Sequence, residues 1–66
     1  MIKTTLKDKV VSNCEIASLL GGHWRGRDPN STAEFFNDDN RLIATRNGWD
    51  LMVQPDLVDR VARVCQ

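Results

Sequence analysis

The sequence predicts a small single domain of the α+β class that spans residues 1–66 and contains two short helices, a β-hairpin and a C-terminal helix. Three observations support this class. Asn47-Gly48 lies between two strand-like runs, which is the strongest short-range signal for a hairpin. Two capping-box patterns precede short apolar segments. An apolar stripe of helical period follows Pro55.

The first seven residues alternate between two kinds of side chain, with Ile2 and Leu6 on one side and lysines on the other. A period of two predicts a short, half-buried strand, which would add a third strand to the hairpin. The alternative is a helix that begins near Thr5 and continues through Leu20. We expect the strand.

The first helix is predicted over residues 12–20. Ser12 and Glu15 have capping-box spacing, in which each side chain accepts a hydrogen bond from the other residue's backbone N–H. Apolar side chains at helical spacing follow. Gly21-Gly22 then supplies the left-handed residue that commonly ends a helix.

A loop and a second short helix are expected next. Residues 23–30 are predicted to form the loop because they contain Gly, Asp-Pro and Asn. Ser31 and Glu34 then repeat the capping-box spacing. Phe35 and Phe36 would be the apolar part of this helix, which frays into a polar, acidic run.

The hairpin is predicted over residues 41–53, with Asn47-Gly48 as a two-residue loop. Both central residues of a type I′ turn need φ > 0, which Gly allows and Asn tolerates. This loop pairs Arg46 with Trp49, and directly paired residues point to the same side of a sheet. The face toward the helices would carry Leu42, Ala44, Trp49, Leu51 and Val53. The other face would carry Arg41, Ile43, Thr45, Asp50, Met52 and Gln54.

The terminal helix is predicted from Pro55 onward. Proline suits the first helical position, and Asp56 suits the positive end of the helix dipole. Asp56 with Arg60 and Asp59 with Arg63 would form ion pairs on the solvent side. The apolar stripe consists of Leu57, Val58, Val61, Val64 and Cys65.

Composition narrows the function classes. Hydrophobic residues make up 41% and charged residues 27%, which is ordinary for a globular domain. Nine basic side chains balance nine acidic ones. Dedicated nucleic-acid binders usually have a basic excess, because phosphate neutralisation supplies much of their affinity. The balance therefore favours a protein partner and leaves DNA as an alternative.

A cytoplasmic protein without a membrane partner is expected. The first eleven residues lack the continuous apolar core of a signal peptide, and no run approaches the roughly 18 apolar residues that span a bilayer. Cys14 and Cys65 are then expected to be reduced thiols. A single disulfide is the alternative for an exported chain.

The sequence carries no pattern that predicts catalysis, a metal or a cofactor. Cys14, Cys65 and His23 are its only soft metal ligands, and they lack the paired short spacings of structural zinc sites. No Walker A, dinucleotide-binding or EF-hand spacing occurs. We therefore expect a protein that is not an enzyme.

The candidate contact residues form two groups. Trp24, Arg25 and Arg27 are of the types enriched at binding hot spots, although this tryptophan could instead lie over the core. Arg46 with Trp49 could form a cross-strand cation–π pair or a second contact point at the hairpin tip. The acidic residues that could face a basic partner surface are Asp28, Glu34, Asp38 and Asp39.

In size and lack of motifs, the chain resembles phage-encoded inhibitors of host defence, anti-CRISPR proteins among them. This resemblance implies a small inhibitor or regulator that docks on a larger, nucleic-acid-binding machine. A homodimer is an alternative under any function, with Ile43 and Met52 as the residues that would carry the contact.

The element order also resembles the small winged-helix domains of excisionases. Residues 15–21 (EIASLLG) would form the first helix of a helix-turn-helix, residues 31–37 the recognition helix and residues 41–53 the wing. This resemblance implies a DNA-binding regulator. Because no basic residue lies between positions 31 and 40, we prefer the protein-binding hypothesis.

Overall fold

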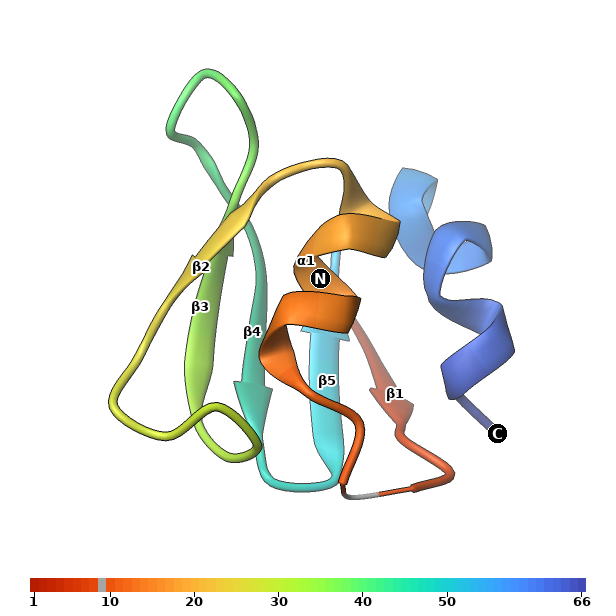
Figure 1. The fold of residues 1–66 in the computed structure, drawn as a ribbon. Helices are drawn as coiled ribbons and strands as arrows, with labels where there is room; N and C mark the ends of the chain where they lie inside the picture. The colour runs from red at the N-terminus through yellow and green to blue at the C-terminus, as the bar shows by residue number, and fades with distance from the viewer. Residues whose placement is uncertain (9) are drawn as a thin grey trace.

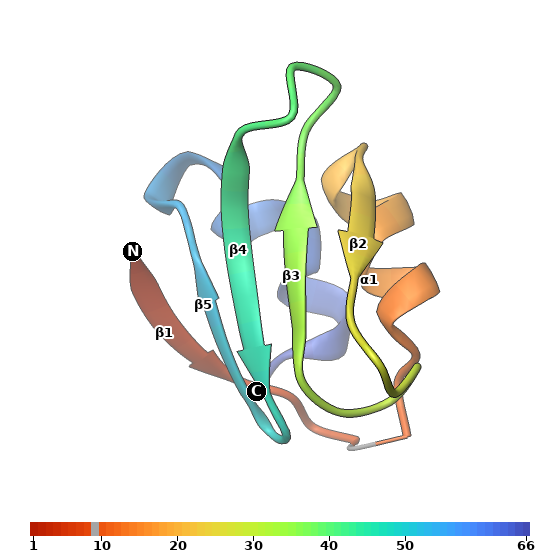
Figure 2. The same cartoon turned by 90° about the vertical axis from the view of Figure 1, so that its left-hand side faces the viewer.

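The computed structural model describes residues 1–8 and 10–66 and contains one antiparallel sheet of five strands. Two helices, α1 (Asn13–Leu20) and the 3₁₀ helix η1 (Pro55–Val64), pack on one face, here called the covered face (Figures 1 and 2). No other described element lies over the opposite, open face. The strands in spatial order are β1 (Ile2–Thr5), β5 (Asp50–Val53), β4 (Leu42–Asn47), β3 (Ala33–Phe36) and β2 (His23–Arg25).

The predicted α+β class with winged-helix order is wrong, because the domain is built on a five-stranded antiparallel sheet with only two short helices. The predicted second helix at residues 31–37 is strand β3, and part of the predicted loop at residues 23–30 is strand β2. Phe35 pairs with Trp24 on one side and with Ala44 on the other. Backbone pairing with two neighbouring strands outweighs the local capping signal. A single sequence does not reveal this pairing, because the partners lie far apart in the chain.

The first strand of the sheet is β1, as predicted. It pairs antiparallel with β5, from Ile2 opposite Val53 to Thr5 opposite Asp50. The end of the chain covers part of its outer edge, where Leu6 forms an isolated bridge with Cys65. The longer helix starting near residue 5 does not form.

Helix α1 matches its sequence signals closely. The side chain of Ser12 accepts a hydrogen bond from the backbone N–H of Glu15 at 3.1 Å. Gly21 ends the helix in the left-handed region with φ 75°. Ile16 and Leu20 are buried beneath it, so the capping signals position an apolar stripe over the sheet.

The hairpin forms, but its two-residue loop lies one position later in the chain than predicted. The loop is Gly48-Trp49, and Asn47 pairs with Asp50. Only the first of the two loop residues has a positive φ, 63° at Gly48, which is the pattern of a type II′ turn with glycine first. Moving the loop by one residue displaces each partner on β5 by two positions, so Ala44, Leu51 and Val53 keep their predicted face toward the helices. Arg46 therefore stands opposite Leu51 on the covered face.

A bulge at Ile43 corrects the predicted faces of Leu42 and Ile43. Phe35 pairs with Ala44, but Phe36 pairs with Leu42, so Ile43 is the extra residue of β4. Ile43 and Ala44 are both buried, and Leu42 is exposed on the open face. The buried hydrophobic core consists of Leu6, Ile16, Ala17, Leu20, Ala33, Phe35, Ile43, Ala44, Leu51, Val53, Val61 and Val64.

The predicted C-terminal α-helix is a 3₁₀ helix. It begins at Pro55, as the sequence indicates, but Val61 and Val64 enter the core at a spacing of three residues. Three residues per turn is the 3₁₀ period, so this apolar stripe stays on one face. Residues four apart diverge in this geometry, and the predicted pairs of Asp56 and Asp59 with arginines do not form within 4 Å among the described residues.

Candidate interaction surface on the open face

The open face carries alternate residues of all five strands. Paired residues line up across it because directly opposite side chains share a face. One row begins at Arg25 on β2 and continues through Glu34, Thr45 and Met52 to Lys3 on β1. A second row is formed by His23, Phe36 and Leu42. The result is a mixed surface of charged, aromatic and aliphatic side chains.

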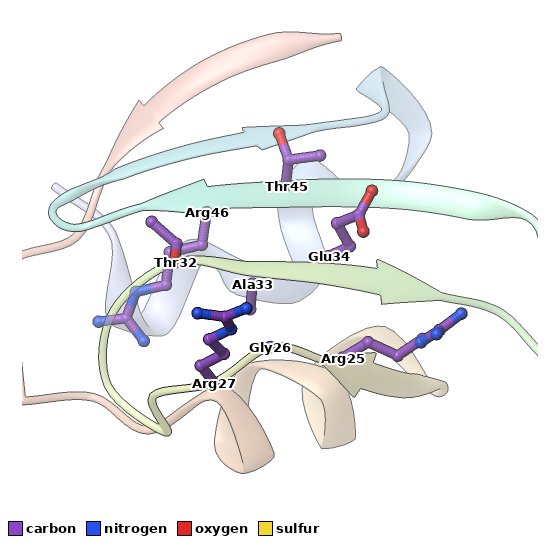
Figure 3. Close-up of a pocket in the computed structure, with 8 residues that line it drawn as sticks. All are labelled: Arg25, Gly26, Arg27, Thr32, Ala33, Glu34, Thr45 and Arg46. Carbon is purple, nitrogen blue, oxygen red and sulfur yellow. The ribbon is translucent and has the colours of Figure 1, made fainter.

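A groove of about 400 Å³ lies at one side of this face, where β2 leads into its connection to β3 (Figure 3). Arg25 and Arg27 line it from the β2 side, and Glu34 and Thr45 line it from β3 and β4. Figure 3 shows Arg27 directed toward β3 and Arg25 directed along β2. Its lining residues are Arg25, Gly26, Arg27, Thr32, Ala33, Glu34, Thr45 and Arg46.

A second groove, of about 330 Å³, continues from the first because Arg25 lines both. Its other lining residues are His23, Phe36 and Asn40. The rings of His23 and Phe36 stack, with centroids 5.6 Å apart and planes inclined by 22°. An aromatic platform therefore lies beside the arginines.

Two of the three arginines that line the first groove, Arg25 and Arg27, have no carboxylate partner within 4 Å among the described residues. Over the described part of the chain, the only ion pair within 4 Å joins Lys3 to Asp50, at 3.6 Å, on an exposed part of the sheet. Arg25 and Arg27 are exposed, and Glu34 lies opposite Arg25 without forming an ion pair. Both guanidinium groups keep donors directed to solvent.

Arg46 belongs instead to a buried polar cluster on the covered face, with only 3% of its surface exposed. Its Nη1 donates to Asn13 Oδ1 at 2.7 Å and to the Val11 carbonyl at 2.6 Å, and its Nε donates to the Gly48 carbonyl at 3.0 Å. Asn13 Nδ2 donates in turn to the Asp28 carbonyl at 2.9 Å. The cluster ties the start of α1 to the hairpin and to the β2–β3 connection.

Electrostatics agree with this placement. Burial lowers the pKa of the Arg46 guanidinium, and the nearby charge of Asp28 acts in the opposite direction. A buried cation is tolerated where its donors are satisfied. Arg46 is therefore part of the internal framework, and its guanidinium is not offered to a partner.

The remaining predicted contact residues are dispersed. Trp24 is half-buried beneath α1, and its indole N–H donates to Cys14 Sγ at 3.2 Å. Trp49 is exposed at the hairpin tip. Asp38 and Asp39 lie in the β3–β4 connection, at the far end of the sheet from the β2–β3 connection that holds Asp28 (Figure 1).

Of the nine predicted residues, the structure brings Arg25, Arg27 and Glu34 together on the open face. The acidic residues do not form one continuous patch. Sequence reasoning missed His23 and Phe36, because both were assigned to a loop or a helix. The alternation in HWR and AEFF is the signal that could have found them.

Among the described residues, no group of three His, Cys, Asp or Glu side chains is arranged to hold a metal ion. Cys14 and Cys65 are both free thiols. No helix in the described ranges is both long enough and apolar enough to cross a bilayer.

No protein-family model, curated protein or solved structure matches this chain.

Proposed function

We propose that this chain is a non-enzymatic protein-binding module that contacts its partner through the open face of the sheet. One observation carries the proposal: no described element covers the open face of the five strands, and this face mixes arginines with aromatic and aliphatic side chains. Arginine, aromatic residues and methionine are enriched at protein interfaces. Phe36, Leu42 and Met52 would supply the apolar contacts.

The proposed role is regulatory or inhibitory. A chain of 66 residues with this face would act by covering a surface of a larger assembly, as the resemblance to phage-encoded inhibitors implies. A cytoplasmic location accords with the two free thiols. An excisionase-like role loses its basis, because strand β3 occupies the segment where the recognition helix would lie.

The test is affinity capture with the full chain and two variants. Met52→Lys places a charge in the middle of the open face, and Arg63→Gln removes an exposed charge from η1, which packs on the covered face. Quantitative mass spectrometry would compare what each form recovers from the source cell lysate. We expect a stoichiometric partner with the natural chain and with Arg63→Gln, and its loss with Met52→Lys.

Circular dichroism would first establish that both variants fold. Recovery of the same partner by all three forms would contradict the open face as the contact surface. Recovery of no stoichiometric partner by the natural chain would contradict a protein-binding function altogether. Mass measurement of the purified chain would identify a second copy of itself as the partner.

A further inference from the structure

We infer that the open face receives an extended acidic segment of the partner protein, with a carboxylate held by Arg25 and Arg27 and an apolar side chain held on the His23–Phe36 stack. This inference rests on the proposed function and specifies its partner. Both grooves lie on the β2 side of the open face and share Arg25. One ligand can therefore occupy them together.

Charge complementarity selects a carboxylate. Arg25 and Arg27 are two residues apart at one edge of the sheet, and both line the larger groove. Neither forms an ion pair with any described residue. A planar guanidinium can donate two parallel hydrogen bonds to one carboxylate, which is a strong and directional interaction. The pair thus offers more donors than the chain itself uses.

Glu34 influences the net charge of the first groove. It lines the same groove and stands opposite Arg25 on β3. With one carboxylate beside the two exposed arginines, the groove retains an excess of positive charge that a single ligand carboxylate would neutralise. Removing the charge of Glu34 should therefore strengthen binding, whereas removing either arginine should weaken it.

Strand geometry accounts for the second contact. His23 and Arg25 are two positions apart on β2, which places them roughly 7 Å apart on one face. An extended ligand segment has the same spacing between its residues i and i+2. A glutamate and a phenylalanine or leucine at these positions would reach the arginines and the aromatic stack at the same time.

The surroundings favour a protein ligand over a nucleic acid. The chain as a whole carries no net charge, and Glu34 in the groove would repel a phosphate backbone. Nucleic-acid binders track several phosphates with a row of cations. Here Lys3, the cation at the opposite edge of the open face, is already paired with Asp50.

The test is a titration of the full chain with defined probes. The first probe is a fluorescein-labelled peptide in which glutamate and phenylalanine alternate with threonine, and the matched probe carries glutamine in place of glutamate. A labelled oligothymidylate is the third. Fluorescence anisotropy would measure each affinity, and amide NMR shifts would locate the binding face.

We expect the acidic peptide to bind with shifts in β2 and β3, and the glutamine peptide to bind about tenfold or more weakly. Arg25→Gln combined with Arg27→Gln should cause a similar loss, Glu34→Gln should tighten binding, and Arg63→Gln should leave it unchanged. Equal affinity of the two peptides, or an equal loss with Arg63→Gln, would overturn the inference. Tighter binding of oligothymidylate than of the acidic peptide would overturn it in favour of nucleic acid.

The two proposals fail in different ways. A captured partner that depends on Met52 but is insensitive to the arginine substitutions would overturn the acidic-segment inference and leave the proposed function intact. Peptide binding without any captured partner would count against the proposed function.

Discussion

Phe35 on the covered face has no exposed surface, whereas its neighbour Phe36 on the open face is only half-buried and stacks on His23. The same contrast holds between Arg46, enclosed in hydrogen bonds, and Arg25, which forms no ion pair with a described residue. The strands thus place chemically similar side chains in opposite environments by alternation alone. Residue type therefore says little about role here, and the face on which a residue lies decides it.

Replacing the two adjacent phenylalanines in turn is the strongest test of this contrast. Phe35→Ala should cost about 3–5 kcal/mol, because it empties the centre of the core. Phe36→Ala should cost about 1 kcal/mol, since part of its ring is already in water. Urea unfolding of both variants would measure the difference. Equal losses would show that the open face is part of the core.

The buried polar cluster tests whether the covered face depends on more than apolar packing. Asn13→Ala removes one of the three acceptors that Arg46 has among the described residues and the donor to the Asp28 carbonyl, and it should cost about 2–4 kcal/mol. Asn30→Ala, at an exposed loop position, is the matched control and should stay within about 0.5 kcal/mol. Thermal unfolding would compare the two variants, and similar melting temperatures would show that the cluster does not stabilise the fold.

Two glycines are compared to test the close approach of Gly22, just before β2, to the end of β3. A Cβ at Gly22 would lie 1.9 Å from the Phe36 carbonyl oxygen, so Gly22→Ala must displace the end of β3 and should cost about 1–3 kcal/mol. A Cβ at Gly48 would meet nothing within 4 Å, and only its positive φ opposes Gly48→Ala, at about 1 kcal/mol. NMR shifts at His23 would report the displacement in the first variant and none in the second.

The helix cap provides the smallest expected effect. Ser12→Ala removes the hydrogen bond to the backbone of Glu15 and should cost about 1 kcal/mol. Ser18→Ala, on the exposed side of the same helix, should cause no loss. Comparing the urea unfolding midpoints of the two variants would separate the effect of the lost cap from the effect of alanine on helix propensity. A loss shared by both variants would contradict the capping role.

Local signals were sufficient for some elements and insufficient for others. Helix α1 and the existence of the hairpin follow from residues close together in the sequence, namely Ser12, Glu15, Gly21 and Gly48. The hairpin register does not, because either Asn47-Gly48 or Gly48-Trp49 can form a two-residue turn. The structure has the Gly48-Trp49 turn, in which Arg46 is buried beside Asn13. That contact joins distant parts of the chain, so residues near the turn do not reveal it.

The candidate site was predictable only in part for a related reason. Arg25 and Arg27 were identifiable by residue type, but their neighbours depend on β2 and β3 pairing across a seven-residue connection, 26–32. The capping pattern at Ser31 and Glu34 indicated a helix there. Once β3 is a strand, Phe36 and Glu34 turn outward and complete the grooves.

The position of β1 has a consequence for the order of folding. Strands β2 to β5 follow one another in both the chain and the sheet, so each pair closes a short loop, but β1 reaches β5 only across most of the chain. Closing that long loop costs conformational entropy and is therefore slow, and β1 gains few stabilising contacts until the other strands are in place. We expect β1 to dock last, and its amides to exchange with deuterium sooner than those of β4.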